Sequence, residues 1–417
     1  MPLCKLLSFH QHLRQKQTSF KFFIVTVLLF ALGDGVFSYQ VPIWLEAVFH
    51  DVALVGIVMS SSSLVGFLCD LSFPTLFAKR DYRFFFVFTF IIALSTQLLG
   101  LLSTSWLVAI LIMALWGAYY ELFLFGLYHY LHTEIEPSQH ASGWGITEAL
   151  RSLALVASPL LVSMLFVLRI DPFRLSSVFF GLSLLITLFM YIRNRKQSAK
   201  STHDPDKALT FVTFRVWSAF LGKIWPIYLF FFCLIMVDAT IWSVGIFFAE
   251  ELRQISPLGA FFVPAYIVPT LLAPLFASKL ARRLGKKRSA FMIAIPLSLT
   301  LFIGHWVLHS PLWHVGVMAL AGCFAGLILT ESEAIFEDYV ARLHRFSSEM
   351  IGLVRSASSL GYIIGPLVAG SLAEVLGVER TLAVIGLLPG IAGIFAYFKM
   401  RGKTRLPQQQ LEEISAY

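Results

Sequence analysis

The sequence predicts an all-α polytopic membrane protein, with twelve transmembrane helices in two pseudo-symmetric bundles of six. Three observations lead to this fold class: the composition, the hydrophobic runs, and a repeat between the halves. Of the 417 residues, 58% are hydrophobic and only 13% are charged, and the mean hydropathy is +0.78. A soluble domain of this size needs a charged surface, which this composition does not supply.

Twelve apolar runs each approach the ~20 residues that a helix needs to cross the bilayer core. They are expected at about 20–45, 53–77, 84–103, 105–131, 141–168, 172–192, 224–249, 257–280, 289–308, 312–339, 347–373 and 378–398. The basic segment 193–223 separates the first six from the last six. We expect an N-terminal bundle at 1–192, a cytoplasmic linker at 193–223, a C-terminal bundle at 224–399 and a cytoplasmic tail at 400–417.

The distribution of lysine and arginine predicts the orientation in the membrane. With the N-terminus inside, 26 of the 32 Lys and Arg residues fall in inside segments and only four fall in outside loops. Both termini are therefore expected in the cytoplasm, with the chain in a plasma or inner membrane. The net charge of +8 follows from this topology and indicates no nucleic-acid partner.

The two halves of the chain share two patterns in the same order. The frame Asp-x11-Glu begins at Asp34 in the first run and at Asp238 in the seventh, an offset of 204 residues. The fifth and eleventh runs align at an offset of 207 residues, which places Glu148 against Arg355. Internal repeats are typical of secondary transporters, whose substrate site lies between the repeats near the bilayer midplane.

Twelve spans, cytoplasmic termini and a long basic central loop resemble the major facilitator superfamily across the whole chain. That family carries a Gly-x-x-x-Asp-Arg-x-Gly-x-Arg-Arg motif between its second and third spans, a weaker copy between its eighth and ninth, and a Gly-Pro motif in its fifth and eleventh. The matching residues are Gly66 and Asp70 in the first copy, Arg283, Gly285, Lys287 and Arg288 in the second, and Gly365 and Pro366 in the eleventh span.

The resemblance implies that spans one, four, seven and ten line a central cavity, and each of these spans carries an acidic residue. The four acids are Asp34, Glu121, Asp238 and Glu331. A charged side chain at the bilayer centre costs roughly 2.5–3.5 kcal/mol on an insertion scale, so it faces the bundle interior or water. These acids either couple transport to protons and bind substrate, or only hold neighbouring helices together through hydrogen bonds.

Polar and aromatic residues near the acids are candidates for the lining of the substrate cavity. They are Ser38, Trp116, Tyr120, Tyr128 and Trp242. Acids combined with aromatic rings suit an organic cation, through charge pairing and cation–π contact. The alternative is that these rings face lipid or the membrane interface, as aromatic residues of membrane helices often do.

A second group of charged residues is expected nearer the cytoplasm, as a gate. Glu148 and Arg151 are three residues apart on span five and can meet on one helical face. Arg355 lies on span eleven, and Glu337 and Asp338 end span ten. This network can close the cytoplasmic side in one state, or it can be a static set of ion pairs. Arg355 could instead bind an anionic substrate.

Clusters of small residues predict close helix packing. They lie at 59–66, 321–326 and 356–361. Gly, Ala and Ser at a helix interface let the backbones approach closely, and we expect such helices to slide during alternating access.

The sequence favours a transporter over an enzyme. It contains no Gly-rich phosphate loop with Lys-Ser or Lys-Thr, no HExxH and no GxSxG. We expect no metal and no cofactor; the expected partners are a small-molecule substrate, protons and the lipid bilayer, and the chain is expected to be a monomer. Proton-coupled export of a lipophilic or cationic compound is the first choice. Proton-coupled uptake of a sugar or other nutrient is the alternative, and a transport-incompetent receptor or lipid-handling protein is the alternative from another class.

Overall fold

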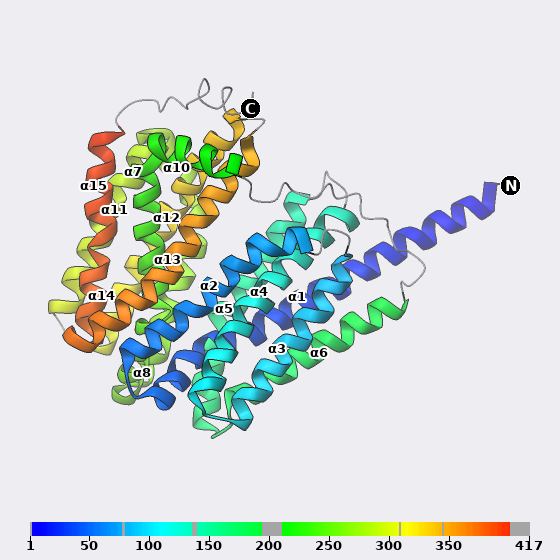
Figure 1. The fold of residues 1–417 in the computed structure, drawn as a ribbon, viewed down its shortest axis with the longest axis horizontal. Helices are drawn as coiled ribbons and strands as arrows, with labels where there is room; N and C mark the ends of the chain where they lie inside the picture. The colour runs from blue at the N-terminus through cyan, green and yellow to red at the C-terminus, as the bar shows by residue number, and fades with distance from the viewer. Residues whose placement is uncertain are drawn as a thin grey trace. The chain divides into compact units, whose positions relative to one another are not determined.

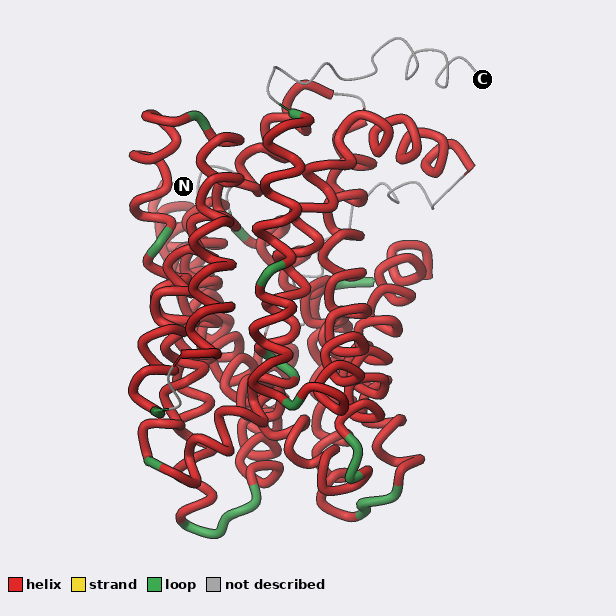
Figure 2. Tube along the Cα trace, turned by 90° about the vertical axis from the view of Figure 1, so that its left-hand side faces the viewer, coloured by secondary structure: helices red, strands yellow, loops and turns green. Residues whose placement is uncertain are grey.

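The computed structural model describes residues 2–76, 80–135, 140–193, 211–307, 310–343 and 346–400. These residues are almost entirely helical, with short connecting loops (Figure 1, Figure 2). Eleven helical segments in the described ranges are long and apolar enough to cross a membrane, and a bent helix pair makes a possible twelfth. The predicted fold class, an all-α polytopic membrane protein, is confirmed.

The first compact unit comprises Met1–Gln40 and Ser72–Asp206. Its helices are α1 (Pro2–Phe49), which continues into the second unit, α3 (Tyr82–Leu102), α4 (Trp106–Glu134), α5 (His140–Val167) and α6 (Pro172–Arg193). Aromatic rings fill the interior between α1 and α4: the ring centroids of Phe30 and Phe123 are 3.6 Å apart, and those of Phe23 and Tyr130 are 3.8 Å apart. These stacked rings fix the register of α1 against α4.

The second compact unit comprises Val41–Leu71 and Lys207–Tyr417. Its helices are α2 (Val52–Leu76), whose end from Ser72 onward belongs to the first unit, α7 (Phe211–Ile241), α8 (Val244–Ile255), the short 3-10 helix η2 (Pro257–Phe261), α9 (Phe262–Leu272), α10 (Pro274–Leu284), α11 (Lys286–Val307), α12 (Pro311–Leu343), α13 (Ser347–Leu376), α14 (Val378–Gly386) and α15 (Leu388–Lys399). α7 begins at Phe211, within the segment predicted as a linker, because Val216, Phe220 and Ile224 at helical spacing are fully buried.

Three spans of the second unit are interrupted. α7 ends at Ile241, and α8 resumes the span at Val244, beyond Trp242 and Ser243. The related span α1 passes through Asp34 without a break. α9 and α10 meet at an angle of 44° next to Pro274. The last span breaks between α14, which ends at Gly386, and α15, which begins at Leu388. Pro389 follows directly and cannot donate a backbone hydrogen bond.

The helix α2 packs against α13 within the second unit, and the two run side by side (Figure 1). A Cβ atom at Gly56 would overlap the carbonyl oxygen of Pro366, and one at Gly370 would lie 2.6 Å from the carbonyl oxygen of Val52. Only glycine permits this approach of the two backbones.

Candidate functional site: two buried aspartates and an intramembrane arginine

Asp34 is a buried carboxylate on α1, with 8% of its surface exposed. Two donors from α4 hold one of its oxygens: the Trp116 indole Nε1–H donates to Oδ1 at 3.1 Å, and the Tyr119 hydroxyl donates to the same oxygen at 2.9 Å. Among the described residues, no group donates to the second oxygen, Oδ2. One carboxylate oxygen is therefore held, and the other is available to a proton or a ligand.

Aromatic packing fixes the two donors to Asp34. Tyr119 is fully buried, and its ring lies 6.1 Å from that of Phe30 and 5.7 Å from that of Phe180. The ring of Phe37 meets the Trp116 ring edge-on at 5.2 Å. Tyr119 follows Trp116 by three residues, so both side chains leave α4 on one face. Tyr119 was not predicted from the sequence, although its spacing from Trp116 could have identified it.

Arg151 on α5 lies close to this aspartate. Its Nη2 donates to the Tyr120 hydroxyl at 2.6 Å, and its Nη1 donates to Glu148 Oε2 at 3.0 Å. The geometric expectation that Glu148 and Arg151 pair on one helical face is confirmed. The guanidinium also interacts electrostatically with Asp34. An acid, a base and their tyrosine partners are thus brought together from α1, α4 and α5.

Asp238, the repeat mate of Asp34, has a different set of partners. It accepts a hydrogen bond from the Tyr362 hydroxyl on α13, and it interacts electrostatically with Tyr266 on α9. It lies in the last turn of α7, and its carbonyl oxygen accepts a bond from the Trp242 amide at 3.1 Å, where the helix breaks. Asp238 therefore ties three helices together, which suits a structural role as well as a functional one. Neither tyrosine was predicted from the sequence.

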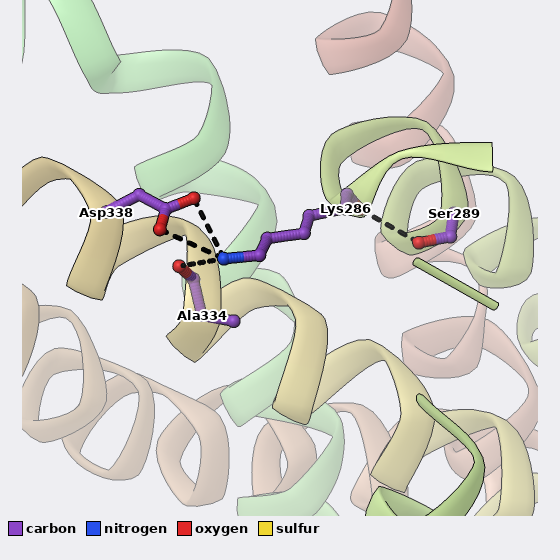
Figure 3. Close-up of polar contacts among 4 residues, drawn as sticks. All are labelled: Lys286, Ser289, Ala334 and Asp338. Atoms are coloured by element: carbon purple, nitrogen blue, oxygen red, sulfur yellow. Dashed lines mark hydrogen bonds and ion pairs between the residues drawn. The ribbon is translucent and has the colours of Figure 1, made fainter. Parts of the chain in front are cut away.

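Glu331 and Asp338 face α11 from the same side of α12, seven residues apart. Glu331 is 2% exposed, and its Oε1 has no hydrogen-bond partner among the described residues. Lys286 Nζ contacts both carboxylate oxygens of Asp338 at 2.9 Å and the carbonyl oxygen of Ala334 at 3.4 Å (Figure 3). The sequence placed Asp338 in a gate but did not identify Lys286 as its partner.

The remaining predicted cavity residues occupy varied environments. Glu121 is half-buried on α4 and interacts electrostatically with Tyr120. The Ser38 hydroxyl donates back to the carbonyl oxygen of Asp34 at 2.7 Å, so it caps its own helix turn. Tyr128 is 46% exposed, and its ring lies 4.5 Å from that of Trp144. The roles of Glu121, Ser38 and Tyr128 in substrate binding remain predictions.

The gate and motif residues lie both within helices and at helix ends. Glu337 and Arg355 are exposed, as are Arg283 and Arg288. Gly285 ends α10 with φ +83°, a left-handed conformation that favours glycine. The other motif residues are placed as follows: Lys287 Nζ lies 5.5 Å from the Tyr339 ring centre, Gly66 is buried, Asp70 is half-buried, Gly365 packs on Ala239 of α7, and Pro366 is inside α13.

In the part of the chain that the structure describes, no group of three or more His, Cys, Asp or Glu side chains could hold a metal ion.

Removing the Lys286–Asp338 pair is expected to have a small effect on stability. The two side chains are 40% and 47% exposed, so Lys286→Met should lower the free energy of unfolding by less than about 1 kcal/mol. Asp338→Asn should lower the free energy of unfolding by the same amount. The double variant should lower it no further than either single variant, because each single variant already removes the same interaction. Thermal unfolding of the purified protein measures this. A loss of about 3 kcal/mol or more would instead indicate a pair shielded from water.

Comparison with known proteins agrees with this architecture. The family profile described as Major Facilitator Superfamily matches residues 23–328 and, in a second match, 227–416. The Staphyloferrin B transporter of Staphylococcus aureus (strain NCTC 8325 / PS 47) is 27% identical over 158 residues, which is 37% of this chain and 36% of that protein. The match therefore spans about a third of that relative's length.

Solved structures with the same fold are also similar to this chain. A bacterial homolog to the human lysosomal transporter Spinster, in an inward-facing and unoccupied conformation, has a TM-score of 0.73 and 14% identity, covering 93% of this chain and 97% of that one. The nucleoside transporter NupG has a TM-score of 0.71 and 14% identity, covering 93% of this chain and 100% of that one. At such low identity these likenesses establish the fold alone.

The chain belongs to the Major Facilitator Superfamily. It is a multi-pass integral membrane protein and a transporter, not an enzyme. The resemblance inferred from its motifs is confirmed.

Proposed function

We propose that this transporter exports a small organic compound bearing a cationic group, in exchange for protons, and that Asp34 carries the proton. The observation that carries the proposal is the asymmetric bonding of Asp34. Oδ1 accepts from Trp116 and Tyr119, while Oδ2 accepts from no described residue. The two donors stabilise the ionised carboxylate, and Oδ2 can take a proton without displacing either of them.

Competition at one carboxylate leads to exchange. A proton and a cationic group cannot both neutralise Asp34, so binding of one favours release of the other. A transporter that changes access only when the site is neutralised then moves the two in opposite directions. With protons entering down their gradient, the organic compound leaves the cell.

The indole of Trp116 supports a cationic rather than a neutral ligand. Its N–H points at Asp34, so the ring borders the carboxylate. A ligand cation near that ring gains cation–π attraction in addition to the charge pair, of about 0.5–2 kcal/mol. A neutral ligand would gain neither.

We also propose the topology expected from the charge distribution. The protein lies in the plasma or inner membrane, with both termini in the cytoplasm. The two six-helix halves rock against each other around the substrate site. The excess of Lys and Arg in the predicted inside segments supports this orientation.

The proposal is tested with purified protein in liposomes and ethidium as the cationic probe. A lumen more acidic than the outside should drive ethidium inward above the level in protein-free liposomes, and a protonophore should abolish the excess. Simultaneous alkalinisation of the lumen, read by an enclosed pH dye, would report the proton leaving. Accumulation that needs the opposite gradient would indicate symport and contradict the proposed exchange.

A further inference from the structure

We propose that Arg151 and Tyr120 form a carboxylate-binding subsite beside Asp34, so that the substrate carries both a carboxylate and a cationic group. This rests on the proposed function for the cationic end, which is assigned to Asp34. The carboxylate end is carried by separate observations on α4 and α5.

Arg151 has hydrogen-bonding capacity that its protein partners do not use. A guanidinium carries five N–H donors, and the described residues use two of them, through Tyr120 and Glu148. The side chain is only 19% exposed, so little water reaches the others. An ionisable residue within a membrane span is costly to retain, which makes a ligand for these donors the direct explanation.

Glu148 is a weak and displaceable partner for this arginine. Its side chain is 61% exposed, so its carboxylate is well solvated. An ion pair of that kind contributes little to stability. A substrate carboxylate could replace Glu148 at Nη1, or bind the adjacent edge of the guanidinium through two parallel N–H bonds.

Tyr120 completes the subsite. Its oxygen accepts from Arg151 Nη2 at 2.6 Å, so its own hydrogen remains to be donated. Together the guanidinium and this hydroxyl present donors that match the two oxygens of a carboxylate.

The subsite and the aspartate are adjacent on one helix. Tyr119 bonds Asp34 and Tyr120 bonds Arg151, and these two tyrosines are consecutive on α4. Consecutive helical side chains point about 100° apart, so the negative and positive groups occupy neighbouring sectors of α4. Asp34 and Arg151 also interact electrostatically. One amphoteric molecule can therefore satisfy both, which a simple lipophilic cation cannot.

The test uses three probes of equal chain length that differ only in their end groups: 5-aminopentanoate, glutarate and 1,5-diaminopentane. Each is added to the purified protein, and the thermal unfolding midpoint is followed with concentration, since a ligand stabilises the state it binds. 5-Aminopentanoate should stabilise the wild type most, and glutarate less because Asp34 repels its second carboxylate.

The variants separate a binding role for Arg151 from a packing role. Arg151→Gln should weaken the apparent affinity for 5-aminopentanoate about tenfold to a hundredfold, the size of a lost charge-assisted interaction. Arg151→Lys should keep only part of the wild-type affinity for 5-aminopentanoate, because an ammonium group cannot bind a carboxylate bidentately. Glu148→Gln should tighten carboxylate binding by removing a competitor. Arg174→Gln, which changes an exposed arginine of α6, is the matched control and should change nothing.

Each outcome bears on one proposal. The subsite is overturned if 5-aminopentanoate and glutarate stabilise the wild type and Arg151→Gln equally. It is also overturned if neither of these two probes stabilises the wild type. Stabilisation by 1,5-diaminopentane alone, if it is lost in Asp34→Asn, also overturns the subsite. That result leaves the proposed function standing. Carboxylate binding that needs Arg151 but is indifferent to Asp34→Asn, with no transport driven by a pH gradient, upholds the subsite and overturns the proposed function.

Discussion

Asp34→Asn is expected to abolish accumulation driven by a pH gradient while exchange of substrate across the membrane stays measurable. Asparagine has nearly the shape of aspartate, and its amide oxygen can still accept from Trp116 and Tyr119, which bond Oδ1 at 3.1 and 2.9 Å. The amide cannot carry a proton, so the gradient no longer drives the cycle. The cationic group also loses its charge partner, and its affinity should fall about tenfold. Exchange should therefore be assayed at saturating substrate, in liposomes loaded with unlabelled compound.

Asp238→Asn is the comparison that identifies which aspartate is coupled. Its carboxylate accepts a hydrogen bond from Tyr362 on α13 and interacts with Tyr266 on α9, so the amide should mainly weaken the contacts among α7, α9 and α13. We expect it to lower the unfolding temperature more than Asp34→Asn does, and to retain gradient-driven accumulation. If the double variant accumulated substrate as well as the wild type, neither aspartate would be the coupling site.

The helical spans could be predicted because they depend on local properties. Hydropathy over ~20 residues decides whether a segment can cross the bilayer, whatever its neighbours are. The same holds for Glu148 and Arg151, whose separation of three residues on one helix fixes their pairing. Interruptions are harder to predict from composition: nothing in the apolar stretch around Trp242 and Ser243 distinguishes it from the uninterrupted α1.

The partners of the aspartates could not be predicted, because packing between helices is non-local and the two halves have diverged. The repeat implies that Asp238 should be held from span ten as Asp34 is from span four. At the offset that aligns spans five and eleven, however, Trp116 and Tyr119 fall on Cys323 and Gly326. The second half has small residues where the first has large donors, so Asp238 takes its donor from another helix, α13.

Small residues on α12 bring α9, which carries Tyr266, close to α12. A Cβ atom at Gly322 would overlap the backbone carbonyl of Tyr266, and one at Gly326 would lie 2.5 Å from the carbonyl oxygen of Thr270. The Thr270 hydroxyl donates to the carbonyl oxygen of Gly322 at 3.1 Å across the same interface. The prediction that the cluster at 321–326 permits close packing is confirmed; its role in sliding remains a prediction.

Gly322→Ala is expected to destabilise the protein by about 1–3 kcal/mol, and Gly322→Val by more. The obstacle to the added methyl group is backbone of α9, which cannot rotate away as a side chain could, so the two helices must separate. Separation would withdraw Tyr266 from Asp238 and break the Thr270 bond. The loss should appear as a lower unfolding temperature and a smaller yield of monodisperse protein.

Gly316→Ala on the same helix is the matched control for Gly322→Ala. A Cβ atom there would meet nothing within 4 Å. Alanine is a better helix former than glycine by about 1 kcal/mol, so this variant should be neutral or slightly stabilising. The two variants make the same chemical change on α12, and their difference isolates the contact with α9. Equal unfolding temperatures for Gly322→Ala and Gly316→Ala would mean that close packing of α9 against Gly322 does not stabilise the protein. The position of Tyr266 near Asp238 would then not depend on Gly322.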